Sequence, residues 1–132
     1  GPILDRIDLH IDVPAVEYAQ IASHEKAESS AAIRQRVNAA RAIQAKRYKD
    51  LPFIKNADLS GAAIKEFCAP DAFGDRFLQH KFETNAISAR GYTRVLKVAR
   101  TIADLAGSEA ILPEHIAEAF QYRTAGKKYE IE

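Results

Sequence analysis

The sequence predicts a mainly α-helical protein, a bundle of four or five helices preceded by one β-strand. Apolar and polar residues alternate over residues 7–13, which is the period-two pattern of a half-buried strand. From about residue 31 onward, apolar residues recur at helical spacing between capping residues, prolines and glycines. Because a lone strand cannot satisfy its ladder hydrogen bonds, we expect the chain to have been cut from a parent that holds the rest of the sheet.

The predicted organisation has four parts. Residues 1–14 hold the strand, residues 15–28 a polar connector, residues 29–124 the helical domain and residues 125–132 a polar tail. A chain of 132 residues is large enough to bury a core without a disulfide or a metal ion. The helical part is therefore predicted to be a single domain.

The first two helices are predicted from their sequence boundaries. The first runs from residue 31 to about residue 48, and its narrow apolar stripe predicts that it is docked on the bundle: Ile33, Val37, Ala40 and Ile43. Leu51 and Pro52 break it, and a loop over residues 56–60 follows. Ser60 is expected to cap a short second helix that ends near Cys68.

The remaining helices have clear faces. The helix over residues 72–83 is expected to give the core Phe73, Phe77, Leu78 and Phe82. The next is capped by Ser88 and ended by Gly107, and its apolar face comprises Tyr92, Val95, Leu96, Ala99, Ile102, Ala103 and Ala106. Its opposite, polar face comprises Arg90, Arg94, Lys97, Thr101 and Asp104. A last helix begins at Pro113 and runs to about Arg123.

Several classes of function are disfavoured by composition. The net charge of +1 gives no general reason to bind nucleic acid, and no apolar run is long enough to span a membrane. With no visible signal peptide, we expect a cytoplasmic location. The single cysteine, Cys68, is most simply a core thiol. A metal site is not expected, because the histidines are dispersed: His10, His24, His80 and His115.

Three segments carry a resemblance to a known family. Residues 1–13 (GPILDRIDLHIDV), 28–37 (ESSAAIRQRV) and 88–107 (SARGYTRVLKVARTIADLAG) resemble the C-terminal part of the ComM/YifB proteins, which are magnesium-chelatase-like AAA+ ATPases of bacteria. The resemblance continues through residues 109–123, so it covers nearly the whole chain. It implies that the strand is the last strand of the ATPase core and that the helices form the lid that closes over the nucleotide.

The resemblance assigns roles to arginines. Arg6 matches the arginine finger that similar ATPases insert into the site of the neighbouring subunit, and Arg90 matches the sensor 2 arginine of the lid. Arg94, one turn later, is the possible substitute for Arg90. Arginine suits these roles because its planar guanidinium binds phosphoryl oxygens in pairs and does not titrate.

The same resemblance implies the cofactors and partners. The intact parent would use ATP and magnesium, whereas this fragment lacks the motif G-x-x-x-x-G-K-[ST] and should bind neither and be inactive alone. Its partners would be its own ATPase core and neighbouring subunits, expected to form a homo-hexamer. DNA, as in the branch migration ascribed to ComM relatives, would be reached through the parent, and no membrane is expected.

Two alternatives remain open from the sequence. The first is a free-standing helical adaptor that binds DNA or protein through basic faces around Arg34, Arg41, Arg90 and Arg94. The second is the lid of the ATPase subunit of a true magnesium chelatase. A DNA affinity that depends on salt would favour the adaptor.

Overall fold

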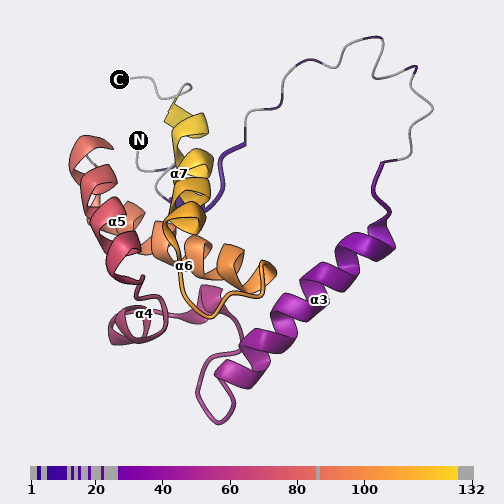
Figure 1. Cartoon of the computed structure of the whole chain (residues 1–132), viewed down its shortest axis with the longest axis horizontal. Helices are drawn as coiled ribbons and strands as arrows, with labels where there is room; N and C mark the ends of the chain where they lie inside the picture. Colours follow the sequence, from indigo (N-terminus) through magenta and orange to yellow (C-terminus); the bar gives the residue numbers. More distant parts are fainter. Residues whose placement is uncertain are drawn as a thin grey trace.

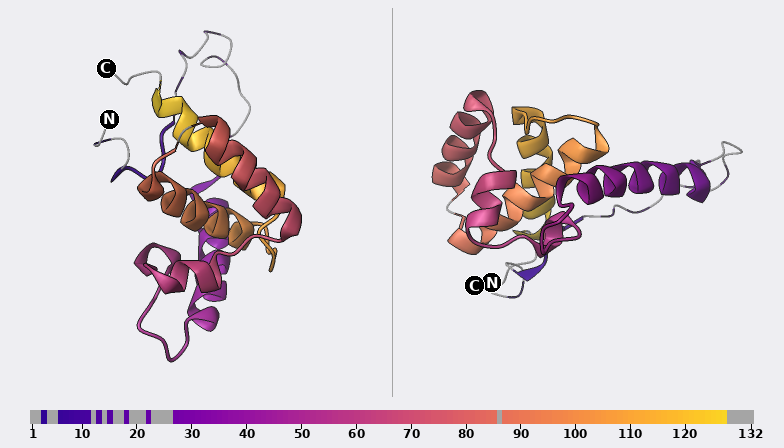
Figure 2. Two further views of the ribbon diagram at one scale, coloured as in Figure 1. Left: turned by 90° about the vertical axis from the view of Figure 1, so that its left-hand side faces the viewer. Right: turned by 90° about the horizontal axis from the view of Figure 1, so that it is seen from below.

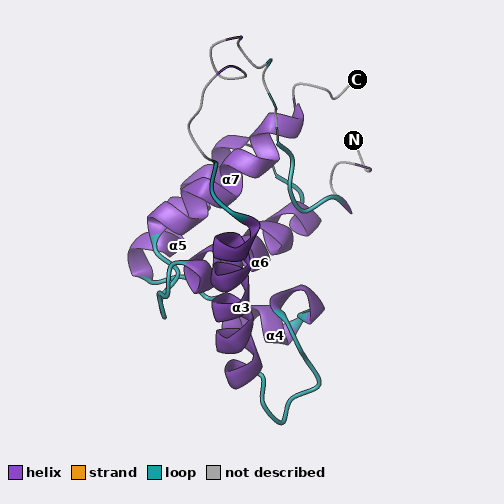
Figure 3. Cartoon of the chain, turned by 90° about the vertical axis from the view of Figure 1, so that its right-hand side faces the viewer, coloured by secondary structure: helices purple, strands orange, loops and turns teal. Residues whose placement is uncertain are grey.

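A computed structural model describes residues 3, 6–11, 13, 15, 18, 22, 27–85 and 87–127. Its elements are α3 (Ser30–Arg47), a short 3-10 helix η1 (Asn56–Asp58), α4 (Ala62–Phe67), α5 (Ala72–Asn85), α6 (Ala89–Leu105) and α7 (Pro113–Lys127). Within these residues there is no strand, only one isolated bridge between Pro70 and Ile111 (Figure 3). The mainly α-helical bundle predicted from the sequence is confirmed.

Helix α6 is the centre of the bundle. It contacts α7, α3, α4 and η1, while α5 packs beside α7 (Figures 1 and 2). The core is built mostly of small and branched side chains, together with the aromatic rings of Tyr48 and Phe120. Its most buried members include Leu78, Val95, Ala99, Ala103, Ile111 and Ile116. The side-chain oxygen of Ser88 caps α6 by accepting from the amide of Gly91 at 3.1 Å, as the sequence predicts.

Helix α3 extends away from the other helices (Figure 1). Only its second half packs on the bundle, through the buried Ala40 and Gln44. The other residues of the predicted apolar stripe, Ile33, Val37 and Ile43, are 38–44% exposed. The predicted docking of this helix on the bundle therefore holds for the second half of α3 and not for its first half, where no described part of the chain covers Ile33 and Val37.

Three side chains differ from their predicted environments. Phe73 is 69% exposed rather than part of the core, and its ring lies beneath the guanidinium of Arg76 at 5.0 Å. Asp104 is buried rather than solvated, because two arginines and an asparagine surround its carboxylate. Ser60 does not cap α4, since the residue before the helix is Gly61, whose φ of 54° favours glycine.

The strand predicted over residues 7–13 is not visible. The described residues of this segment form no ladder, and the amide of His10 instead donates to the carbonyl of Tyr122 on α7 at 2.6 Å. A ladder needs a neighbouring strand, and the described part of the chain offers none. Most of the predicted connector over residues 15–28 and residues 128–132 of the predicted tail lie outside the described residues.

Helix α7 ends at Lys127, four residues beyond the end predicted near Arg123. No helix among the described residues has both the length and the apolar character needed to cross a membrane.

Candidate functional site

The N-terminal segment 6–11 lies against α6 and α7, and an ion pair joins it to Arg94, one of the predicted site residues. The carboxylate of Asp8 pairs with the guanidinium of Arg94 on α6, across 86 positions of sequence. The Nε atom of Arg94 is buried and makes no hydrogen bond to any described atom. The donors of this guanidinium are therefore only partly used by Asp8.

A second set of contacts holds the same segment to α7. His10 and Arg123 are 8% and 7% exposed. The Nδ1 atom of His10 lies 3.2 Å from the carbonyl of Arg123, and its Nε2 atom lies 3.0 Å from the carbonyl of Ile7. The guanidinium of Arg123 donates to that same Ile7 carbonyl at 2.8 Å. Side chains from two ends of the chain thus fix the backbone of the segment.

The first turn of α6 is tightly packed at this place. A Cβ atom added to Gly91 would lie 2.6 Å from the Cγ2 atom of Ile87 and 3.5 Å from the Nη2 atom of Arg123. The first distance is shorter than van der Waals contact, so a larger residue would force Ile87 to move. Glycine at position 91 therefore lets the N-terminus of α6 approach Ile87 and Arg123.

The three arginines predicted from the sequence lie in different environments. Arg6 is exposed and stands two residues before Asp8, and Arg90 is exposed in the first turn of α6. Arg94 is partly buried and paired with Asp8. The Asp8–Arg94 pair therefore ties the segment of Arg6 to the helix that carries Arg90. Sequence reasoning did not single out His10, Asp8 or Arg123, although Arg123 lies within the segment of resemblance.

A separate polar cluster joins α3, η1 and α6. The carboxylate of Asp104 accepts from Arg47 at 2.5 and 3.0 Å, from Asn56 at 2.9 Å and from Arg100 at 3.2 Å. The hydrogen bond to Asp104 raises the pKa of Arg47 above its ordinary value, so this guanidinium stays charged. Tyr48 completes the cluster by donating to the side-chain oxygen of Asn56 at 2.6 Å. This cluster holds the C-terminal end of α3 against α6.

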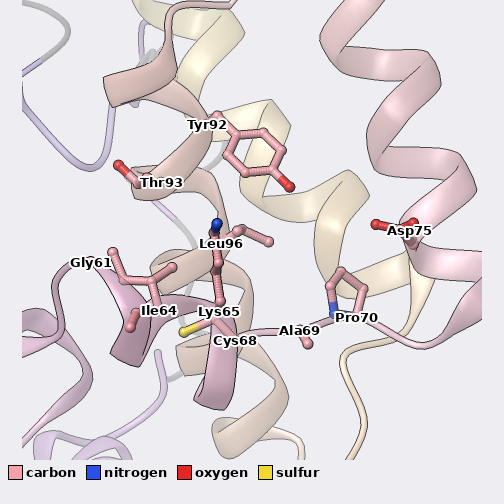
Figure 4. A pocket seen from close by; sticks show the side chains of 11 residues that line it. Gly61, Ile64, Lys65, Cys68, Ala69, Pro70, Asp75, Tyr92, Thr93 and Leu96 are labelled. Carbon is pink, nitrogen blue, oxygen red and sulfur yellow. The ribbon is translucent and has the colours of Figure 1, made fainter.

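An open groove of about 640 Å³ lies between α4, α5 and α6 (Figure 4). Apolar side chains dominate its lining, with Lys65, Asp75 and Tyr92 among its polar residues. Cys68 at its base is fully buried, and burial raises the pKa of its thiol to about 11. The groove holds none of the predicted site arginines.

No group of three or more histidine, cysteine, aspartate or glutamate side chains in the described part of the chain is placed to hold a metal ion.

Comparisons with known proteins agree on one family. A family model described as magnesium chelatase, subunit ChlI C-terminal, matches residues 27–123. The uncharacterized protein YifB of Salmonella typhimurium is 39% identical over 124 residues, which cover 93% of this chain and 24% of that protein. The competence protein ComM of Haemophilus influenzae is 39% identical over 127 residues, with the same shares covered. An uncharacterized protein of Mycobacterium tuberculosis is 31% identical over 128 residues, covering 97% of this chain and 25% of that protein. The chain thus spans about a quarter of the length of these curated relatives.

Proposed function

The chain belongs to the family described as magnesium chelatase, subunit ChlI C-terminal, and we propose that it is the helical lid of an AAA+ ATPase of ComM/YifB type. The observation that carries the proposal is the ion pair between Asp8 and Arg94. It connects the segment that holds the proposed arginine finger to the helix that holds the proposed sensor. A lid that couples ATP binding to movement needs such a connection between its phosphate-sensing helix and the ATPase core.

Arg90 is the proposed sensor for phosphate in the same subunit. Its side chain is exposed in the first turn of α6, where free backbone amides and the helix dipole already favour an anion. Arg94 is a second candidate, and it would have to leave Asp8 before it could contact a phosphate. In the intact parent, ATP supplies the phosphoryl group that is transferred, and residues outside this chain would hold the magnesium ion.

Arg6 is the proposed finger that completes the site of a neighbouring subunit. Charge accumulates on the oxygens of the transferred phosphoryl group, and a guanidinium inserted from outside neutralises it. Arg6 is exposed, so its side chain is available to a neighbour. The assembled parent, proposed to be a homo-hexamer, would then act as a motor, and DNA is the substrate that the ComM/YifB resemblance favours.

The test uses the full-length protein that would contain this chain at its C-terminus. Arg90→Ala should raise the KM for ATP by about tenfold or more, since one charge-assisted phosphate contact would be lost. The control is Arg76→Ala, because Arg76 is an exposed arginine on α5 whose guanidinium donates to the Ala72 carbonyl and lies over the Phe73 ring of the same helix. Wild-type KM and kcat in Arg90→Ala would reject the proposed sensor.

One observation favours a second candidate function, a helical adaptor for DNA. Helix α3 carries five arginine and lysine residues and no acidic residue over its 18 positions. Two of the five are engaged in ion pairs, Arg36 with Glu28 and Arg47 with Asp104. Fluorescence anisotropy with duplex DNA at two salt concentrations distinguishes the functions, because an adaptor would bind tightly with a steep salt dependence and a lid would not.

A further inference from the structure

We propose that His10 and Arg123 act together as a clasp, two positioning residues that set the place of Arg6 relative to the first turn of α6. The proposal rests on the function proposed above, in which Arg6 and Arg90 work on ATP. Neither clasp residue touches a nucleotide in this scheme. They act by fixing the position of the segment that contains Arg6 while the lid moves.

The contacts of the clasp are made to the backbone. The amide of His10 donates to the carbonyl of Tyr122, and both ring nitrogens of His10 face carbonyl oxygens, those of Arg123 and Ile7. Whichever ring nitrogen carries the proton, a carbonyl acceptor lies within 3.2 Å. Arg123 adds a charged donor to the Ile7 carbonyl at 2.8 Å. The main chain of the segment is therefore held at the His10 amide and at the Ile7 carbonyl, and Ile7 directly follows Arg6, the proposed finger.

Because these contacts are buried, losing one of them is expected to be costly. Because His10 and Arg123 are each less than a tenth exposed, a lost partner leaves a polar group without water to replace it. By contrast, the ion pair of Asp8 with Arg94 is partly exposed, with nearly half of the aspartate side chain in solvent. Solvent therefore reaches Asp8 more readily than it reaches His10 or Arg123, so the ion pair is more open to exchange than the clasp.

The clasp also meets the sensor helix. The Nη2 atom of Arg123 lies 3.5 Å from the position of a Cβ atom on Gly91, which directly follows Arg90. Arg123 thus stands at the meeting point of α7, the first turn of α6 and the backbone of Ile7. A movement of the first turn of α6 is transmitted through this packing to the segment that holds Arg6.

The test compares Arg123→Leu and Arg123→Lys in two measurements. In this chain, Arg123→Leu should speed hydrogen exchange of the His10 amide by about tenfold, with the core amides of α6 unchanged. In the full-length protein it should lower kcat by about tenfold to a hundredfold and leave the KM for ATP unchanged, as expected for misplacement of a catalytic group. Arg123→Lys keeps a charged donor and should recover much of the kcat.

The controls separate the clasp from general packing and from the proposed function. Arg76→Leu and His80→Gln replace exposed residues of the same types on α5 and should change neither measurement. If Arg123→Leu loses protection of α6, His10→Gln takes its place in both measurements. Unchanged His10 exchange, unchanged kcat, or a rise in KM alone would overturn the clasp. A silent Arg6→Ala would instead reject the proposed finger, whereas an inactive Arg6→Ala beside a silent Arg123→Leu would reject only the clasp.

Discussion

Replacement of Asp104 by alanine tests how helix α3 is held to the bundle. The Asp104 side chain is fully buried and accepts four hydrogen bonds, from Arg47, Asn56 and Arg100. The side chains of Arg47 and Arg100 are 18% and 5% exposed. Asp104 is thus the shared counter-charge of two guanidiniums that solvent reaches poorly.

The magnitude follows from what the substitution leaves behind. Asp104→Ala leaves two guanidiniums without their shared counter-charge, and breaking a buried ion pair in this way costs about 3–5 kcal/mol. For a chain of 132 residues, this corresponds to a fall of about 10–20 °C in Tm. Asp104→Asn keeps the shape but removes the charge, so we expect a smaller loss of about 1–3 kcal/mol.

The assay is urea and thermal unfolding followed by circular dichroism at constant pH. The matched control is Glu28→Ala, which removes the partner of Arg36 from an ion pair whose side chains are about half exposed. That variant should lose no more than about 1 kcal/mol. If Asp104→Ala is as mild as Glu28→Ala, the cluster around Asp104 does not hold α3 to the bundle.

Three further predictions concern single positions. Gly91→Ala should lower stability by about 1–3 kcal/mol although alanine is the better helix former, because its Cβ meets Ile87, and in thermal melts the same substitution should cost less in an Ile87→Ala background than in the parent chain. Cys68, with its thiol pKa raised to about 11 and no exposed surface, should react with a thiol reagent at pH 8 only after unfolding, and rapid labelling of the folded chain would contradict this. Burial raises the pKa of Tyr48, so folding favours its protonated form, and the stability that this form contributes is lost as the pH rises above about 10, its pKa in the unfolded chain. The urea midpoint should therefore fall more between pH 8 and pH 11 in the parent chain than in Tyr48→Phe. Equal falls in the two chains would count against burial of Tyr48 as the cause.

The helices could be predicted because residues at or next to their ends determine where they begin and end. Ser88 and Gly107 bound α6 as expected, and Pro113 begins α7. Apolar spacing also identified the buried face of α6, including Val95 and Ala99. Capping and periodicity depend on residues a few positions apart, so one sequence suffices to predict them.

Burial that depends on distant neighbours was less predictable. The stripe of Ile33 and Val37 shows which residues share a face, but not whether another helix covers that face. Asp104 was placed on the polar face of its helix, yet Arg47, 57 positions away, pairs with it in the interior. Such pairing is fixed by tertiary packing rather than by spacing.

The clasp was missed for a related reason. The period-two pattern makes His10 a polar residue on the solvent side of a strand. In the structure its ring is buried against Arg123, which lies 113 positions later in the chain. No periodic pattern relates two segments so far apart. The candidate arginines themselves came from the family resemblance, and their roles remain proposals.

The steady-state ATPase activity of the full-length protein, measured in subunit-mixing experiments with Arg6→Ala, tests the proposed lid most directly. We expect Arg6→Ala to bind nucleotide but to lose about 10³ to 10⁵ in turnover. Mixing it with a second inactive variant that retains Arg6 should restore activity, because the finger acts on a neighbour. A parent that hydrolyses no ATP, or an Arg6→Ala variant with wild-type turnover, would show that this chain is not the lid of an ATPase that uses Arg6 as its finger.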